Sequence, residues 1–288
     1  MRNLIFKLLF IVSFLCVSCE NQLNTTPTDF VNLVDYYKNE DQLNKGLTGI
    51  YSVLGDPAMY QDALLHNMSY SNDDGVFVYT QAALIAPSNF SYSTSEATIT
   101  NLWNTLYRGI NLANILLEAI DGEGTSSVKS EVKAKIKAQA LFLRAYYYYM
   151  LVDRWGAVPM PLSATKSAKE IDMASTPVAE VYAKIVEDMT AAEAVLPQAS
   201  TLGSNSSGRL SKNTAQGILA RVCLSMTGFP LNDESKYKDV IFWCNKVMSK
   251  GENSLNPNYS ELFVRQARDE YYVQENMWEV EFYGNVSD

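Results

Sequence analysis

The sequence predicts an all-α protein in which antiparallel helix pairs stack side by side into a superhelical array. Between residues 131 and 249, successive stretches carry apolar residues at i, i+3 and i+4 spacing on a single side, and loops separate them. No single pair of such helices can bury its own apolar face, so the pairs are expected to stack. In addition, residues 55–100 are expected to form an irregular, aromatic-rich layer, and residues 275–282 a short terminal strand with one buried face.

The helix predicted over residues 134–155 is the one around which the others are arranged. Gly156 can adopt a left-handed conformation after its last turn, and Pro159 and Pro161 cannot continue a helix, so the chain should leave it extended. The predicted apolar stripe contains small residues that let a neighbouring helix approach closely. It consists of Ala134, Ala138, Leu141, Ala145, Tyr148 and Val152.

The other helices follow from the same spacing. A first helix over residues 41–54 carries Gly46 and Gly49, which are expected to let another backbone approach. Further helices are predicted at residues 102–120, 177–196, 211–226 and 235–249, the last with a stripe of Tyr237, Val240, Ile241, Cys244 and Val247. Cys223 and Cys244 fall on consecutive helices. We expect two reduced core cysteines, with a disulfide as the alternative.

The composition indicates a globular protein with an acidic surface. The 288 residues are 47% apolar, enough for one large core or two smaller ones. The formal charge is -9, and Lys and Arg do not cluster with aromatic residues, which excludes nucleic acid as an expected partner. The 18 tyrosines exceed what core filling needs, so many of their rings should lie at surfaces or in grooves.

Residues 1–18 have the features of a bacterial lipoprotein signal peptide. A positively charged start precedes an apolar run that is too short to remain in a membrane as a helix. A small residue then precedes Cys19, which is the expected lipidation site, although Cys16 stands where Leu is usual. The alternative is an ordinary signal peptide followed by a free cysteine. Residues 19–40 are expected to form a tether and N-terminal segment.

The run FLRAYYYYMLVDRWGAVPMPL, residues 142–162, closely resembles the hallmark helix of the SusD/RagB family of Bacteroidetes. The resemblance implies tetratricopeptide-like helix pairs in a lipoprotein at the outer face of the outer membrane. It also implies capture of a nutrient, mostly a glycan, for a SusC-like TonB-dependent porin. A second family pattern, WxxxYxxIxxxN, is present as Trp103, Tyr107, Ile110 and Asn114.

The resemblance covers nearly the whole chain, but proteins of the family continue well past the position of Asp288. We therefore expect residues 41–288 to form a SusD-like helical domain that is incomplete at its C-terminus. Such an array should expose an apolar face at its C-terminal end.

The sequence offers little for catalysis, and no enzyme activity, cofactor or metal site is expected. His66 is the single histidine, so a His-based metal site or a Ser-His-Asp triad is not supported. Asp73 and Asp74 are the best carboxylate pair for glycoside hydrolysis, but neighbouring side chains generally point apart. A calcium loop also fails, because Tyr70 occupies its first ligand position.

A saccharide-binding surface is the better hypothesis for the aromatic-rich segment. Aromatic rings stack on the C–H faces of sugars, and nearby Asp and Asn side chains bind hydroxyl groups. The candidate ligand-binding residues are Tyr70, Asp73, Asp74, Tyr79, Phe90, Tyr92, Asn101 and Tyr283. The alternative is that most of these rings only anchor a long loop. A scaffold that stabilises the porin, and a peptide in place of a glycan, also remain open.

Overall fold

The computed structural model describes residues 36–61, 64, 90–91, 93, 96–167, 172–203, 208–249, 251–268, 275–280 and 282. From Tyr37 onward the described residues belong to one compact unit. They contain helices and no strand, and an isolated antiparallel bridge joins Val158 to Thr176. The predicted all-α fold class is therefore confirmed.

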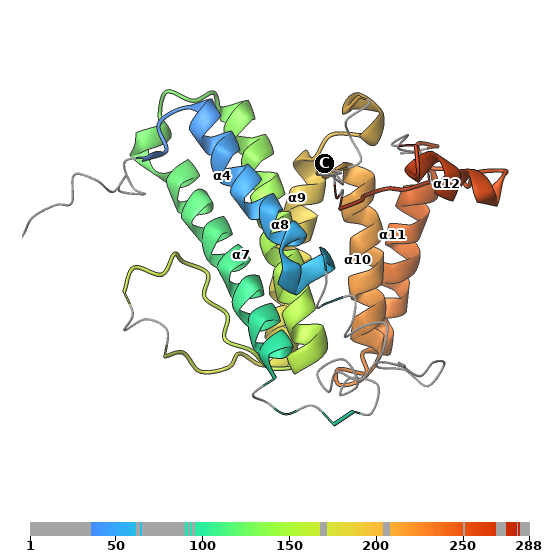
Figure 1. Cartoon of the computed structure of the whole chain (residues 1–288), viewed down its shortest axis with the longest axis horizontal. Coiled ribbons are helices and arrows are strands. Elements are labelled where there is room, and N and C mark those ends of the chain that lie inside the picture. Colours follow the sequence, from blue (N-terminus) through green and yellow to red (C-terminus); the bar gives the residue numbers. More distant parts are fainter. Residues whose placement is uncertain are drawn as a thin grey trace, which may run out of the picture. The chain divides into compact units, whose positions relative to one another are not determined.

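The long helices are α4 (Glu40–Ser52), α7 (Ala97–Asp121), α8 (Ser130–Trp155), α9 (Val178–Val195), α10 (Lys212–Thr227), α11 (Tyr237–Ser249) and α12 (Tyr259–Gln266). Short helical turns are η1 (Val53–Gly55), η2 (Pro57–Gln61), η3 (Glu123–Thr125), η5 (Ala199–Thr201) and η6 (Glu234–Lys236). Helix α4 packs on α7 and α8, α8 on α7 and α9, and α10 on α9 and α11, which gives the predicted array (Figure 1).

Helix α8 is buried on all sides between Phe142 and Tyr148, which corrects the prediction of a single apolar stripe along it. The consecutive residues Phe142, Leu143, Arg144, Ala145 and Tyr146 are all buried, although successive side chains point in different directions around a helix. The surrounding helices α4, α7 and α9 account for this burial. Even the guanidinium group of Arg144 lies inside the protein.

The ends of the helices follow the predicted signals. Helix α8 ends at Trp155, and Gly156 has a φ of 70°, the positive value that favours glycine. Helix α10 begins after Ser211, whose hydroxyl accepts from the backbone N–H of Thr214 at 3.1 Å in a capping box. Helix α7 begins at Ala97 instead of residue 102, so it extends further toward the aromatic-rich segment than predicted.

The two glycines predicted to allow close packing in α4 behave differently. A Cβ on Gly46 would lie 2.6 Å from the ring of Tyr37, so the absence of a side chain is needed there. Nothing lies within 4 Å of the corresponding position on Gly49. The prediction was therefore wrong for Gly49.

Helix α11 turns a different face inward from the one predicted. Trp243 is its buried residue, whereas Tyr237, Ile241 and Cys244 are exposed. Among the long helices, α11 packs mainly on α10, and Lys246 also pairs with Glu193 of α9 at 3.2 Å, so only a narrow face is covered. Large apolar side chains are exposed on α11 and α12, at the end of the array where an exposed apolar face was expected: Tyr237, Ile241, Phe242, Met248, Tyr259 and Phe263. Both Cys223 and Cys244 are free, as predicted, but the prediction that both lie in the core was wrong for Cys244, which is exposed, whereas Cys223 is buried.

The terminal segment is not the predicted strand in its described part. Residues 275–280 and 282 are extended or turn-like and have no described strand beside them with which to pair. The predicted buried face is nevertheless partly correct, because the Trp278 ring stands edge-on to Phe142 at 5.8 Å and to Tyr146 at 5.2 Å between centroids. Packing against α8, not sheet pairing, positions this segment.

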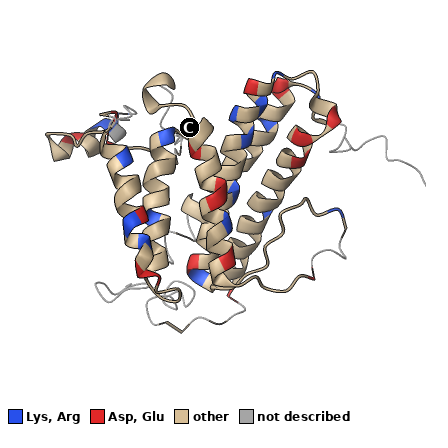
Figure 2. Cartoon of the chain, turned by 180° about the vertical axis from the view of Figure 1, so that it is seen from behind, with Lys and Arg blue, Asp and Glu red and all other residues tan. Residues whose placement is uncertain are grey.

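The charged side chains are distributed as on a solvated surface. Acidic and basic residues are interspersed over the helices in Figure 2, and several form exposed pairs such as Lys135 with Glu131 at 2.7 Å and Lys137 with Asp121 at 2.7 Å. Within the described ranges, no helix is both long and apolar enough to cross a membrane.

Candidate ligand-binding site

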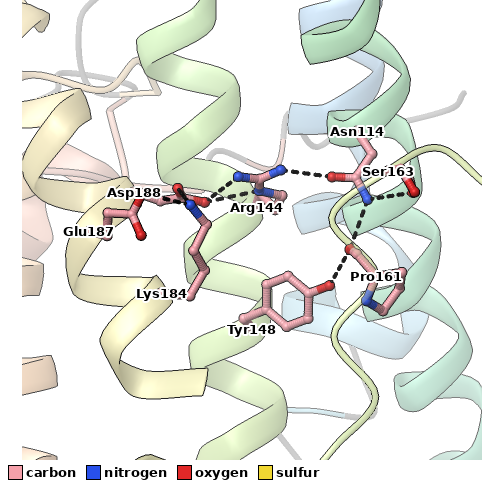
Figure 3. A network of polar contacts seen from close by, with 8 residues as sticks. All are labelled: Asn114, Arg144, Tyr148, Pro161, Ser163, Lys184, Glu187 and Asp188. Atoms are coloured by element: carbon pink, nitrogen blue, oxygen red, sulfur yellow. Dashed lines mark hydrogen bonds and ion pairs between the residues drawn. The ribbon is translucent and has the colours of Figure 1, made fainter. Parts of the chain in front are cut away.

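A buried polar network in the centre of the array holds three helices together (Figure 3). Arg144 on α8 donates to Asp188 Oδ2 on α9 through Nε at 2.9 Å and Nη2 at 2.6 Å, and through Nη1 to Asn114 Oδ1 on α7 at 2.9 Å. The Arg144 and Asp188 side chains are 7% and 4% exposed. Lys184 Nζ lies 3.0 Å from Asp188 Oδ1, so both carboxylate oxygens have partners. The network therefore satisfies a buried charge pair.

The same network fixes the extended segment that follows α8. Asn114 donates to the carbonyl oxygens of Pro161 at 2.9 Å and Ser163 at 3.0 Å. The hydroxyls of Tyr148 and Tyr107 donate to the carbonyls of Pro161 at 2.6 Å and Pro159 at 2.7 Å. Burial raises the pKa of both tyrosines, which therefore remain neutral donors. Tyr107 and Asn114, two residues of the WxxxYxxIxxxN pattern, thus have a structural role.

A polar cavity lies where η2 meets the start of α7, and we call it the α7 cavity. Its volume is about 290 Å³, and it is lined by Asp56, Pro57, Ala58, Thr98, Asn101, Asn104 and Thr105. Asp56 is held in place by an ion pair with Arg108 and by a hydrogen bond from the Ala58 backbone N–H at 2.8 Å. The wall of the cavity therefore contains a carboxylate in a fixed position, next to several polar side chains of α7.

Three side chains of the α7 cavity have unused hydrogen-bonding capacity. The buried Oγ1 of Thr98 has no partner. The side-chain amides of Asn101 and Asn104 are exposed, and none of the described residues bonds to them. Amide and hydroxyl groups both donate and accept, which is what recognition of sugar hydroxyls requires.

The α7 cavity also lies at both ends of the aromatic-rich segment in the sequence. Pro57 and Ala58 come shortly before residues 62–95, and Thr98 comes shortly after them. Described residues that flank this segment on both sides in the sequence therefore line the cavity.

Of the predicted ligand-binding residues, the structure describes Phe90 and Asn101. Asn101 lines the α7 cavity. Phe90 is 67% exposed and has a φ of 51°, so its ring is not part of the core. The other predicted residues lie outside the described ranges: Cys19, Tyr70, Asp73, Asp74, Tyr79, Tyr92 and Tyr283. Sequence reasoning missed Thr98 and Asn104, although their i, i+3 spacing with Asn101 on one helix would have indicated a shared face.

A second cavity, which we call the aromatic cavity, lies between α8, α10 and the terminal segment. Its volume is about 470 Å³, and its lining residues are Tyr60, Tyr146, Thr214, Gly217, Ile218, Arg221, Met277, Trp278, Val280 and Phe282. This cavity could not be predicted from the sequence, because its residues come from four separate parts of the chain. Among the described residues, inside these cavities and outside them, there is no group of three His, Cys, Asp or Glu side chains placed to bind a metal ion.

The chain is similar in sequence to proteins of one known family. A model of a SusD-like family, described as starch-binding and associating with the outer membrane, matches residues 13–224. The chain is 25% identical over 290 residues to SusD-like protein P25 of Formosa agariphila and 26% identical over 285 residues to SusD-like protein P2 of the same organism. The alignments cover 98% of this chain in both cases, but 52% and 54% of the two relatives.

The fold is also similar to solved structures. The crystal structure of a SusD homolog from Bacteroides thetaiotaomicron superposes with a TM-score of 0.79 at 26% sequence identity. The superposition covers 89% of this chain and 49% of that one. The chain thus spans about half the length of the proteins to which it is similar.

Proposed function

Because the chain belongs to the SusD-like family of starch-binding proteins associated with the outer membrane, we propose that it captures an oligosaccharide nutrient at the cell surface. In this proposal it is lipid-anchored through Cys19 and delivers its ligand to a SusC-like TonB-dependent porin. Residues 1–18 act as the signal peptide, residues 19–40 as the tether, and residues 41–288 as the SusD-like helical domain.

The observation that carries the proposal is the set of unused polar groups in the α7 cavity. Asn101 and Asn104 lie on the exposed side of α7 and have no described partner, and the buried Thr98 hydroxyl beside them is unpaired. Burying a hydroxyl without a hydrogen bond costs free energy, so a bound sugar hydroxyl would relieve that cost. Asp56, held by Arg108, offers a fixed acceptor next to them.

The α7 cavity supports binding without catalysis. Among the described residues that line the cavity, Asp56 is the one that carries a carboxylate. Glycoside hydrolysis needs two carboxyl groups, one on each side of the scissile bond. The buried network around Arg144 keeps α7 and the segment after α8 in fixed positions. A rigid wall with free hydrogen-bonding groups suits a binding protein, because little entropy is lost when a ligand binds.

The proposed site predicts a loss of affinity in the double variant Asn101→Ala/Asn104→Ala. We expect about tenfold weaker binding of the best ligand from a panel of maltoheptaose, laminarihexaose and similar neutral oligosaccharides, since each lost hydrogen bond contributes about 0.5–1.5 kcal/mol. Isothermal titration calorimetry measures the effect. The melting temperature should stay unchanged, because both side chains are exposed.

Asn245→Ala provides the matched control, because Asn245 is exposed on α11, far along the chain from the cavity. It should bind as the parent does. Unchanged affinity in the double variant would show that the α7 cavity is not the saccharide site. Tyr79→Ala and Tyr92→Ala test the aromatic segment in the same assay, and each lost stacking ring should weaken binding without lowering the melting temperature.

Two alternatives give different outcomes in these experiments. If peptides bind and every glycan fails, the ligand class is a peptide. If no ligand binds but the porin co-purifies with the chain, the protein is a scaffold for the porin.

The proposed lipid anchor is tested by Cys19→Ala. Two or three acyl chains give stable attachment, whereas one chain gives only marginal binding. The variant should therefore move from the membrane pellet to the soluble fraction after cell lysis. Retention of the variant in the membrane fraction, as strong as that of the parent, would rule out lipidation of Cys19 as the anchor.

A further inference from the structure

The aromatic cavity has the size and the ring content of a binding site for a sugar unit. Its volume of about 470 Å³ falls within the roughly 300–1,000 Å³ of ordinary ligand pockets. Trp278 is half-buried, and Phe282 is 49% exposed, so parts of both rings are accessible. The edge-on contacts of Trp278 with Phe142 and Tyr146 hold the indole in position, and Tyr60 shares a hydrogen bond with Tyr146 at the cavity wall.

The same cavity contains a cation that no described residue neutralises. Arg221 on α10 is exposed and lines the cavity, and none of the described carboxylates pairs with it. This contrasts with Arg144 and Arg108, which are paired with Asp188 and Asp56. A guanidinium group presents parallel N–H donors that match the two oxygens of a carboxylate or a sulfate.

Two cations, Arg221 and Arg154, lie near enough to the cavity wall to act on the Tyr146 hydroxyl, although the chain carries a net charge of -9. Burial raises the pKa of the Tyr146 hydroxyl well above its ordinary value, the neighbouring Tyr60 adds to this effect, and the cations Arg221 and Arg154 act in the opposite direction. Arg154 donates to the carbonyl of Met150 at 3.1 Å and lies 3.6 Å from Asp153, so it is partly neutralised. Arg221 is therefore the group left to receive an anion.

We propose that the aromatic cavity binds an acidic sugar unit, with the Arg221 guanidinium paired to its carboxylate or sulfate and Trp278 and Phe282 against its ring. The inference rests on the proposed saccharide-binding function but assigns it a second site and a charged ligand class. Neutral sugar hydroxyls bind at the α7 cavity, and the anionic unit binds at the aromatic cavity.

The test is the affinity of the full mature chain for tetragalacturonate, measured by isothermal titration calorimetry. Arg221→Met keeps the length of the side chain but removes its charge, and should weaken binding at least about tenfold, because hydrogen bonds between charged groups are the strong ones. Arg221→Lys keeps the charge without the forked geometry and should recover part of the affinity. Fully methyl-esterified tetragalacturonate, which has the same rings and no charge, should bind the parent as weakly as tetragalacturonate binds Arg221→Met.

Arg268→Met is the matched control, because Arg268 is exposed and does not line the cavity. It should bind tetragalacturonate as the parent does. A sulfated galactose tetrasaccharide, measured in the same way, tells whether the cavity recognises a carboxylate or a sulfate. The recognised anion is the one on the ligand that loses more affinity when Arg221 is replaced by Met. Raising the salt concentration should weaken the binding of the recognised anion.

The outcomes separate this inference from the proposed function. Three outcomes would overturn the inference. Tetragalacturonate could bind Arg221→Met as tightly as it binds the parent, or the methyl-esterified ligand could bind the parent as tightly as tetragalacturonate does. The third outcome is that neither anionic probe binds the parent. If neutral oligosaccharides still depend on Asn101 and Asn104, the proposed function survives that failure. Conversely, loss of anion binding in Arg221→Met with no effect of Asn101→Ala/Asn104→Ala on any ligand would support the aromatic cavity and reject the α7 cavity.

Discussion

Replacing Arg144 by Met should lower the free energy of unfolding by about 3–5 kcal/mol, because the change leaves the buried carboxylate of Asp188 without its main partner. Arg144 donates two hydrogen bonds to Asp188, at 2.9 and 2.6 Å, and a third to Asn114. Met fills a similar volume, so the loss reflects charge and hydrogen bonding more than a cavity. Chemical denaturation of the mature chain, followed by circular dichroism, measures the change.

The matched control is Lys137→Met, which removes an exposed cation from the same helix. Lys137 pairs with Asp121 at 2.7 Å, but the two side chains are 39% and 63% exposed, so the cost should be below about 1 kcal/mol. The double variant Arg144→Met/Asp188→Leu should be more stable than Arg144→Met alone, since it no longer buries a carboxylate that has lost its two hydrogen bonds from Arg144. An Arg144→Met variant as stable as Lys137→Met would show that the network does not contribute to the stability of the array.

The helices could be predicted from the sequence because apolar periodicity and capping residues act locally. Ser211 at the start of α10 and Gly156 after α8 are examples in which one residue type indicates the boundary. The burial of a helix depends instead on how many neighbours it has. Helix α8 packs on α4, α7 and α9 and also contacts α10, whereas α11 packs mainly on α10, so the predicted stripes were too narrow for the first and wrong for the second.

The candidate site could be predicted only in part, for the same reason. Asn101 could be proposed because it lies close in sequence to the aromatic-rich segment. The aromatic cavity could not, because Tyr60, Tyr146, Arg221 and Trp278 meet only when α8, α10 and the terminal segment are packed together. The role of Arg144 could not be predicted from the sequence either. Its position among aromatic residues does not indicate that its partners are Asn114 and Asp188.

Replacing Gly109 by Val should lower the free energy of unfolding by about 3 kcal/mol, near the upper end of the usual cost of overpacking a core. A Cβ at Gly109 would lie 2.6 Å from Cε2 and 2.7 Å from Cδ2 of the Tyr147 ring, which is too close for any carbon contact. The ring cannot move away easily, because Tyr147 is 0% exposed and its hydroxyl donates to the Ile50 carbonyl at 2.6 Å. Helices α7 and α8 would have to separate.

Gly49→Val is the matched control, because Gly49 is also in a helix interior but has nothing within 4 Å of its Cβ position. Val has a slightly higher helix propensity than Gly, so stability there should change by less than about 0.5 kcal/mol. Thermal and chemical denaturation of the two variants compare the same substitution with and without a clash. Helix propensity has the same effect at both sites. The difference between the two changes in the free energy of unfolding therefore measures the cost of the clash between α7 and Tyr147. Equal stability of the two variants would mean that α7 and α8 are further apart than the structure places them.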